Sequence, residues 1–245
     1  MLSKNAAKYI QSLQHKKFRD QYGVFVAEGR KLVGELLQQG VFKCRAVYAT
    51  EKAVAEGSFF ANAPNIETIQ EFELQKISSL STPNQVLAIF EKSQENKTPD
   101  LAQKISLALD DIQDPGNLGT IIRNADWFGI EHIICSLHTA DMYNPKVVQS
   151  TMASIGRVNI MYTDLEGFLK TAAQQKYAAV LNGAFVHEIK KPSEAIIIIG
   201  NESKGICPEI LALQPQKITI KQFGGAESLN AGVASAVILQ EFLLH

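Results

Sequence analysis

The sequence predicts an α/β protein: an open, mostly parallel sheet, with a small N-terminal α/β domain in addition. The main observation is a series of short, strongly apolar runs after residue 104, each bounded by turn residues: Ile105–Leu109, His132–Cys135, Ala178–Leu181, Ile196–Ile199 and Ile218–Ile220. Such runs are typical of parallel strands whose two faces are both covered by helices. Helical patterns separate them, so ligands are expected at the carboxyl ends of the strands.

Composition is that of an ordinary globular protein. Of the 245 residues, 46% are hydrophobic and 20% charged, with a formal net charge of −1, which excludes a disordered chain. No apolar run approaches the roughly 20 residues that cross a bilayer, and residues 1–18 lack the apolar core of a signal peptide. Cys44, Cys135 and Cys207 are widely separated, which favours reduced thiols in a cytoplasmic protein. The five histidines are scattered, and no metal site is predicted.

A domain boundary is predicted near residue 97. The stretch 91–104 is polar and contains Thr98-Pro99-Asp100, which is typical of a linker. We therefore expect an N-terminal domain over residues 1–97 and a C-terminal domain over residues 98–245. In the first of these, the apolar periods predict two helices and then two strands: Asn5–Lys17, Gly29–Gln39, Arg45–Ala49 and Val86–Phe90.

Positive charge is concentrated at the N-terminal end. Residues 1–45 carry nine basic and three acidic side chains, whereas the rest of the chain carries 15 basic and 22 acidic ones. A local excess of this kind indicates a polyanionic partner such as RNA, and the candidate contacts are Lys16, Lys17, Arg19 and Arg30. The alternative is a solvated, lysine-rich helix face, which charge alone favours.

The first of three distinctive loops follows the first apolar run and leads into a helix. Asn117, after a Pro-Gly turn, is the predicted N-cap, and the helix is predicted to end at Gly129. Arg123 and Trp127 lie one turn apart on its predicted exposed face, which suits contact with a nucleotide or a second subunit. The alternative is a surface arginine paired with an acid such as Asp126.

The second loop, Gly200-Asn201-Glu202-Ser203-Lys204-Gly205, directly follows a buried apolar run. Glycines at such a position allow a ligand to approach the backbone closely. Glu202 suits the N-terminus of a helix, where negative charge is stabilised. The loop matches neither a Walker A sequence nor the dinucleotide fingerprint.

The third loop, Gly224–Asn230, opens the last predicted helix, Ser228–Leu244. Ser228 suits an N-cap, whereas Asn230 would be half buried in a nearly apolar helix and would need partners. The exposed face of this helix is predicted to consist of small residues: Ala231, Gly232, Ala234 and Ser235. Such residues allow another helix to approach closely, either in the core or in a dimer interface.

In their order and spacing, the three loops resemble the motifs of the SpoU–TrmH family of RNA ribose 2′-O-methyltransferases. The matching residues are Asn117-Leu118-Gly119 with Arg123 and Phe128-Gly129, then Gly200–Gly205, then Ser228-Leu229-Asn230. Thr151–Ser154 resembles the family's small-residue turn, and the segment from Lys16 to Gly29 resembles its ribosomal-protein-like substrate-binding domain. The resemblance covers nearly the whole chain.

The resemblance implies a C-terminal trefoil knot, a homodimer with its active site at the subunit interface, and S-adenosyl-L-methionine bound in the knot. Carried over by position, the cofactor contacts are Gly200, Ile220 and Leu229. The catalytic and substrate-binding positions are Arg123, Glu202, Asn117, Ser228 and Asn230. The implied partner is structured RNA, with ribosomal RNA preferred and transfer RNA as the alternative. The sequence departs from the family pattern where Lys221 replaces the usual proline and where Phe223 precedes Gly224.

Methyl transfer to a ribose needs the 2′-OH close to in line with the methyl group, and negative charge builds on its oxygen. A guanidinium rarely gives up its proton, so we interpret Arg123 as stabilising the developing alkoxide or an adjacent phosphate. Glu202 is expected to orient Arg123 or a neighbouring backbone group. Asn230 and Ser228 are expected to position the ribose and the cofactor.

Three other functions fit parts of the sequence. A non-catalytic RNA-binding ribosome-assembly factor would keep the fold without binding S-adenosyl-L-methionine. An α/β enzyme of another class would prefer NAD or ATP, whose fingerprints the sequence lacks. A purely structural module would leave the three loops unexplained.

Overall fold

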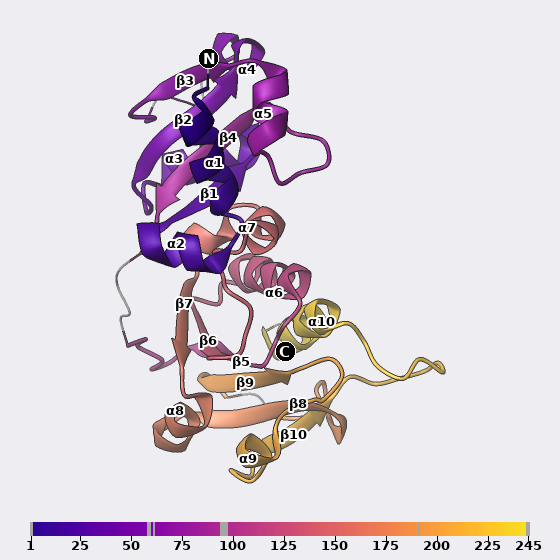
Figure 1. The fold of residues 1–245 in the computed structure, drawn as a ribbon. Helices are drawn as coiled ribbons and strands as arrows, with labels where there is room; N and C mark the ends of the chain where they lie inside the picture. The colour runs from indigo at the N-terminus through magenta and orange to yellow at the C-terminus, as the bar shows by residue number, and fades with distance from the viewer. Residues whose placement is uncertain (1, 58–59, 61, 94–97, 191, 244–245) are drawn as a thin grey trace. The chain divides into compact units, whose positions relative to one another are not determined.

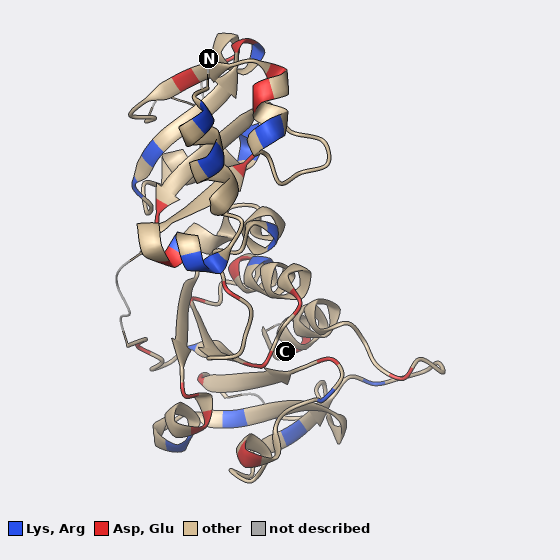
Figure 2. Ribbon diagram, viewed as in Figure 1, with Lys and Arg blue, Asp and Glu red and all other residues tan. Residues whose placement is uncertain are grey.

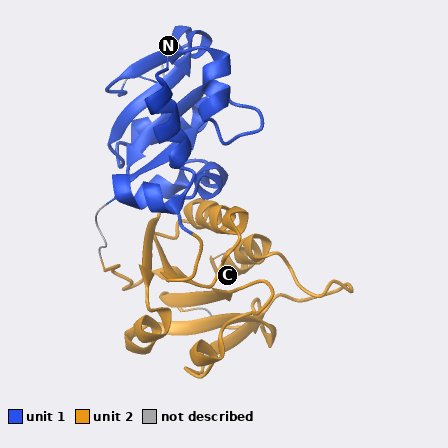
Figure 3. Ribbon diagram, viewed as in Figure 1, with its two compact units in different colours: residues 1–95, 141–156 blue, residues 96–140, 157–245 orange. Residues whose placement is uncertain are grey.

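The computed structural model describes residues 2–57, 60, 62–93, 98–190 and 192–243 (Figure 1). The chain divides into two compact units, one of residues 1–95 with 141–156 and the other of residues 96–140 with 157–245 (Figure 3). The segment 141–156 therefore packs with the N-terminal unit. The domain ranges 1–97 and 98–245 stay a prediction. Among the helices that the structure describes, none is long and apolar enough to span a bilayer.

The N-terminal unit contains a four-stranded sheet in the order β1-β4-β2-β3, with β2 and β3 parallel and the other pairs antiparallel. In chain order its elements are α1 (Lys4–Ser12), α2 (Lys16–Tyr22), β1 (Val24–Glu28), α3 (Arg30–Gln39), β2 (Cys44–Thr50), α4 (Glu51–Ala55), β3 (Ile66–Ile69), α5 (Glu71–Ile77), β4 (Val86–Glu91), α7 (Pro145–Thr151) and the 3-10 helix η2 (Ser154–Gly156). The second predicted helix and both predicted strands of this unit are confirmed.

The single helix predicted over Asn5–Lys17 is wrong, because the chain turns between α1 and α2. Leu13, at the turn, is fully buried. Arg19 Nη1 donates to the carbonyl oxygens of Leu13 and Gln14 at 3.0 and 2.8 Å. The guanidinium thus satisfies carbonyl groups that the interruption leaves without helical partners.

Hydrophobic packing covers both faces of this sheet. Helices α1 and α5 cover one face through a buried cluster made of Ile10, Leu13, Val24, Val26, Tyr48, Ile69, Leu74, Ile77, Leu87 and Ile89. Phe25 alternates with the β1 members of that cluster, so its ring faces the other side. There it contacts Phe42, Phe90 and Tyr143 at ring-centroid distances of 5.0, 5.7 and 4.9 Å.

The C-terminal unit contains a six-stranded, parallel sheet in the order β10-β8-β9-β5-β6-β7. This confirms the predicted mostly parallel α/β sheet, while the trefoil knot stays a prediction. In chain order the elements are β5 (Ile105–Asp110), α6 (Pro115–Trp127), β6 (His132–Ser136), β7 (Asn159–Thr163), α8 (Leu165–Thr171), β8 (Gln175–Phe185), β9 (Ala195–Gly200), α9 (Pro208–Leu211), β10 (Gln216–Thr219) and α10 (Ala231–Leu243). Each of the five predicted strands overlaps an observed one, and β7 is an addition.

Helices α6 and α10 lie side by side over one face of this sheet, and α8 and α9 lie over the other (Figure 1). The small residues of α10 were predicted to be exposed, and for three of them this is wrong: Ala231, Gly232 and Ser235 are buried. Asn124 Nδ2 on α6 donates to Gly232 O at 2.7 Å and to Ser235 Oγ at 2.9 Å. The small face of α10 therefore serves close packing within one chain.

Candidate active site

The first two loops leave the sheet at adjacent positions. Asp110, the last residue of β5, pairs in register with Gly200, the last residue of β9. Beyond this point, Asn201 Nδ2 donates to Asp111 O at 2.8 Å and joins the two loops directly. The loops therefore meet at the carboxyl end of the sheet, where ligands bind in open α/β folds.

Helix α6 starts earlier than predicted, and its N-cap is Asp114 instead of Asn117. Pro115 occupies the first helical position, and Asp114 Oδ1 accepts a hydrogen bond of 2.9 Å from Asn117 N. Proline suits this position because the first helical N–H has no helical partner. The earlier start places Asn117 in the first turn, where its largely buried side chain is available for other contacts.

The structure brings Asn117, Glu202 and Asn230 into one hydrogen-bond network. Asn230 Nδ2 donates to Asn117 Oδ1 at 2.8 Å and to Glu202 Oε1 at 3.0 Å. Asn117 Nδ2 also donates to Glu202 Oε1, and the N–H of Ala231 donates to the same oxygen at 3.1 Å. One carboxylate oxygen therefore joins all three sequence motifs.

Asn230 is the residue from which α10 begins, which corrects the predicted start at Ser228. Its Oδ1 accepts hydrogen bonds from the N–H groups of Gly232 and Val233 at 3.0 and 3.3 Å. This is the arrangement of an N-cap. Asn230 has the hydrogen-bond partners that were predicted for it, but the prediction that it is half buried is wrong, because the residue is exposed. The carboxylate of Glu202 lies at the same helix N-terminus, where its negative charge is stabilised.

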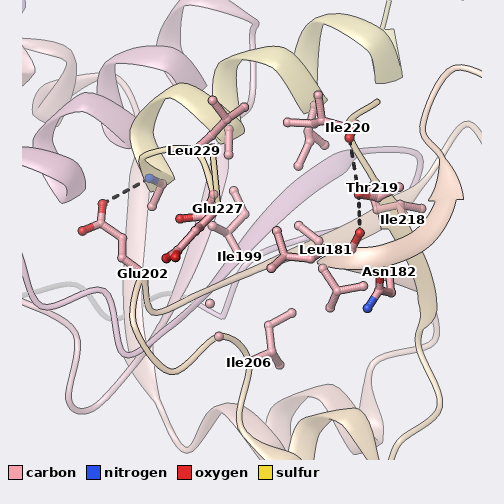
Figure 4. Close-up of a pocket in the computed structure, with 18 of the residues that line it drawn as sticks. Leu181, Asn182, Ile199, Glu202, Ile206, Ile218, Thr219, Ile220, Glu227 and Leu229 are labelled. Atoms are coloured by element: carbon pink, nitrogen blue, oxygen red, sulfur yellow. Dashed lines mark hydrogen bonds between the residues drawn. The ribbon is translucent and has the colours of Figure 1, made fainter. Parts of the chain in front are cut away.

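A cavity with a volume of about 740 Å³ opens beside this network. Its walls come from the ends of β8, β9 and β10, from the second and third loops and from α10. Ile199, Ile206, Ile218 and Leu181 contribute apolar side chains (Figure 4). The predicted site residues among its walls are Gly200, Glu202, Ile220, Ser228 and Leu229.

The cavity depends on a tight turn after Gly200. A Cβ atom at this position would lie 2.4 Å from Gly205 C, far inside the contact distance of real side chains. Asn201 and Gly205 exchange two backbone hydrogen bonds of 3.0 and 2.8 Å across the turn. The Oδ1 atom of Asn201 accepts from Ser203 N and Lys204 N at 2.9 and 3.2 Å. Asn201 therefore organises the loop, although the sequence pattern did not single it out.

Arg123 lies apart from the network. It is exposed on α6, and Trp127 one turn later is 84% exposed. Among the residues that the structure describes, no hydrogen bond or ion pair involves the Arg123 guanidinium. Asp126, the alternative partner, pairs with Arg157 at 2.8 Å. Of the two predicted targets of Glu202, the structure shows the backbone group, at Ala231, and not Arg123.

The four candidate RNA contacts differ in exposure. Basic side chains are grouped on α2 (Figure 2), where Lys16 and Lys17 are exposed. Arg19 is 1% exposed, and its Nη2 pairs with Asp141 Oδ2 at 2.7 Å, so the guanidinium is not available to phosphate. Arg30 is half-buried and forms an ion pair with Glu56. Lys16 also pairs with Asp20, at 3.2 Å on the surface.

Comparison with known proteins places the chain beside RNA methyltransferases. Residues 104–240 match the model of the SpoU rRNA methylase family, and residues 4–88 match the MRM3-like substrate binding domain. Over 231 residues the chain is 29% identical to the 23S rRNA (guanosine(2553)-2′-O)-methyltransferase RlmP of Bacillus subtilis, covering 93% of this chain and 91% of that protein.

Two solved structures are similar to this chain over nearly its whole length. A TrmH-family structure from Porphyromonas gingivalis is 35% identical, with a TM-score of 0.87 and coverage of 99% of this chain and 98% of that one. The AdoMet-bound rRNA methyltransferase from Sinorhizobium meliloti is 31% identical, with a TM-score of 0.84 and coverage of 98% and 95%.

Proposed function

This chain belongs to the SpoU rRNA methylase family, and we propose that it transfers a methyl group from S-adenosyl-L-methionine to a ribose 2′-OH of ribosomal RNA. The observation that carries this proposal is the network of Asn117, Glu202 and Asn230 at the edge of the cavity. It fixes three polar side chains from three separate loops at the carboxyl end of a parallel sheet. The rRNA methyltransferases among its relatives support the choice of substrate.

The cavity fits S-adenosyl-L-methionine in size and chemistry. Its volume lies within the roughly 300–1,000 Å³ of small-molecule sites. Ile220 and Leu229 would hold the apolar parts of the cofactor, and Gly200 would let the backbone approach it. The carboxylates of Glu202 and Glu227, both on the cavity wall, suit its positive charge. When bound, the group supplies an electrophilic methyl on a sulfonium.

The residues of this chain then have to place a ribose and stabilise its oxygen. The Asn230 amide donates to the Asn117 amide, and both donate to Glu202, so their orientation is fixed before RNA arrives. Glu202 holds both amides and the start of α10, which makes it a positioning residue. Ser228 lies on the cavity wall and is placed to bind ribose or cofactor. Arg123 is assigned to the charge that develops on the 2′ oxygen, because a guanidinium stays protonated.

A homodimer is part of this proposal. Arg123 has no intrachain ion pair among the described residues, and it lies beside an exposed tryptophan. An active site at a subunit interface would give this guanidinium a role in the second subunit's reaction. The proposal also includes a trefoil knot formed by the C-terminal strands. It includes a cytoplasmic location as well, where free thiols such as those of the three cysteines stay reduced.

The N-terminal unit is proposed to hold the RNA, with Lys16 and Lys17 as phosphate contacts. Both ammonium groups are exposed on α2, and exposed basic side chains supply most of the affinity for a polyanion. Arg30 is a secondary candidate, because Glu56 already compensates its charge.

Calorimetric titration with S-adenosyl-L-methionine and its demethylated product, beside NAD and ATP, tests the proposed function. We expect the methyl donor and its product to bind and the other two nucleotides not to bind. If the donor does not bind even with ribosomal RNA present, the chain is a non-catalytic relative and the proposal is wrong.

A further inference from the structure

An aromatic and basic cluster lies at the rim of the cavity, and the function proposed above gives its side chains no role. Lys221 Nζ lies 5.3 Å from the Phe223 ring centroid and 5.6 Å from that of Phe185. The ring of His187 is stacked on Phe185 with centroids 5.7 Å apart and an interplanar angle of 10°. Lys221 is therefore in cation–π contact with the rings of Phe223 and Phe185, and the Phe185 ring stacks on that of His187.

The backbone holds these side chains in place. Phe185 ends β8 and pairs in register with Thr219 of β10, and Val186 N donates to Thr219 O at 3.0 Å. Gln222 Nε2 donates to the carbonyl oxygens of Gly224 and Ala226 at 2.8 and 2.7 Å and closes the loop that follows Phe223. These bonds shape the turn next to Phe223, whose ring is exposed.

Exposure and charge indicate the chemistry of that partner. Phe223 is 89% exposed, and nearby Leu181 is 69% exposed. Lys221 forms no ion pair with any residue that the structure describes, so its charge is available to an anion. A flat apolar ring next to a positive charge suits a nucleobase and its phosphate, because every base has a face that can stack.

The place of the cluster on the cavity wall indicates which nucleotide of the RNA would stack there. Lys221 and Phe223 belong to the cavity wall, as do Ser228 and Leu229 of the third motif. A ribose that enters the proposed site must carry its own base, and its neighbours, across this rim. We propose that Phe185, His187, Lys221 and Phe223 form a stacking platform for an unstacked RNA base at or next to the methylated nucleotide, with Lys221 binding its phosphate. This inference rests on the proposed function.

Matched variants and two probes test the platform. Phe223→Leu removes the ring and keeps an apolar side chain, whereas Phe223→Tyr keeps the ring. The probes are a nine-nucleotide oligoadenylate and the same RNA backbone with abasic residues, with affinity measured by fluorescence anisotropy. Stacking predicts that Phe223→Leu weakens oligoadenylate binding about tenfold, that Phe223→Tyr retains it, and that abasic RNA is unaffected. Lys221→Gln should weaken both probes, because it removes a phosphate contact.

Several outcomes would overturn the inference. The first is that the unaltered protein binds neither probe. The second is that Phe223→Leu loses the same affinity for both probes, and the third is that this variant binds oligoadenylate as tightly as the unaltered protein. A lower affinity of Phe223→Leu for S-adenosyl-L-methionine would assign the ring to the cofactor instead. A change in its light-scattering mass would assign the ring to a second copy of the chain. Failure of the unaltered protein to bind the methyl donor even with ribosomal RNA present would refute the proposed function, while the oligonucleotide affinities would still test the platform.

Discussion

Asn117 Oδ1 accepts a hydrogen bond of 2.8 Å from Asn230 Nδ2, although the two residues lie 113 positions apart in the chain. Both amides also donate to one oxygen of Glu202. The contact joins the first turn of α6 to the N-cap of α10 at the end of the parallel sheet. Each of the three side chains depends on the other two for its orientation.

Replacing Glu202 should therefore impair catalysis more than cofactor binding. Glu202→Ala leaves three donors without their acceptor, and we expect kcat to fall about 100-fold because the amides lose their fixed orientation. Glu202→Gln keeps an accepting oxygen and should lose less. Single-turnover transfer of labelled methyl groups measures the effect. Wild-type kcat in Glu202→Ala would exclude a positioning role.

Gly200→Ala should weaken cofactor binding while the protein still folds. The added Cβ would meet the Gly205 backbone at 2.4 Å, so the loop must shift into a different shape. We expect at least a tenfold loss of affinity for S-adenosyl-L-methionine in calorimetry. Gly225→Ala is the matched control, because a Cβ there meets nothing within 4 Å and Gly225 is not on the cavity wall. Equal affinities of the two variants would contradict the assignment.

Arg123→Ala should lower kcat by about 100- to 1,000-fold, the usual effect of removing one donor to a developing oxyanion. If Arg123 acts by stabilising charge and not as the base, the pH–rate profile of the slow variant should keep the shape seen for the unaltered protein. Loss of a titrating limb in Arg123→Ala would instead identify Arg123 as the base.

Substitutions on α2 should affect stability and RNA binding separately: Arg19 should matter for the free energy of unfolding, and Lys16 and Lys17 for RNA affinity. Arg19→Ala leaves the Asp141 carboxylate unpaired, and we expect a loss of about 3 kcal/mol in the free energy of unfolding, measured in denaturant. The double variant Lys16→Gln/Lys17→Gln should change stability by less than about 0.5 kcal/mol and make RNA affinity less dependent on salt. Unchanged RNA affinity in the lysine variant would place the RNA elsewhere.

Cysteine labelling should report on burial around the sheets. Burial raises the pKa of Cys207, next to the second loop, to about 11, and burial does the same for Cys44. A raised pKa lowers the thiolate fraction, so alkylation at pH 8 should be about 100-fold slower than for an ordinary thiol. Labelling by iodoacetamide, followed by mass spectrometry, should keep rising with pH up to about 11. A plateau near pH 9 would contradict this.

The strands that were predicted from sequence are those with continuous apolar runs, such as Ile196–Ile199. Of the strands that were not predicted, β1 is fully buried, and its apolar run between two helices was missed. Strand β3 has only one buried residue, Ile69, and β7 is largely half-buried. Neither offers the apolar run or the alternation by which a strand is recognised. Their place depends on pairing with distant strands, which local sequence does not encode.

The site residues were predicted by motif, but their contacts were not. Helix starts were misplaced by two or three residues because Asp114 and Asn230 both compete with neighbours as N-caps, and only tertiary contacts decide between them. Arg19 looked like its lysine neighbours in sequence. Its partner Asp141 lies 122 positions away, which explains why its burial could not be foreseen.

The most direct test of the central proposal is methyl transfer in vitro. Unmodified 23S ribosomal RNA, transcribed in vitro, is incubated with the protein and labelled S-adenosyl-L-methionine, and the RNA is digested to nucleosides. We predict label in a single 2′-O-methylated nucleoside and strongly reduced label with Glu202→Ala. Label on a base, or none in ribosomal RNA when transfer RNA is labelled, would contradict the account.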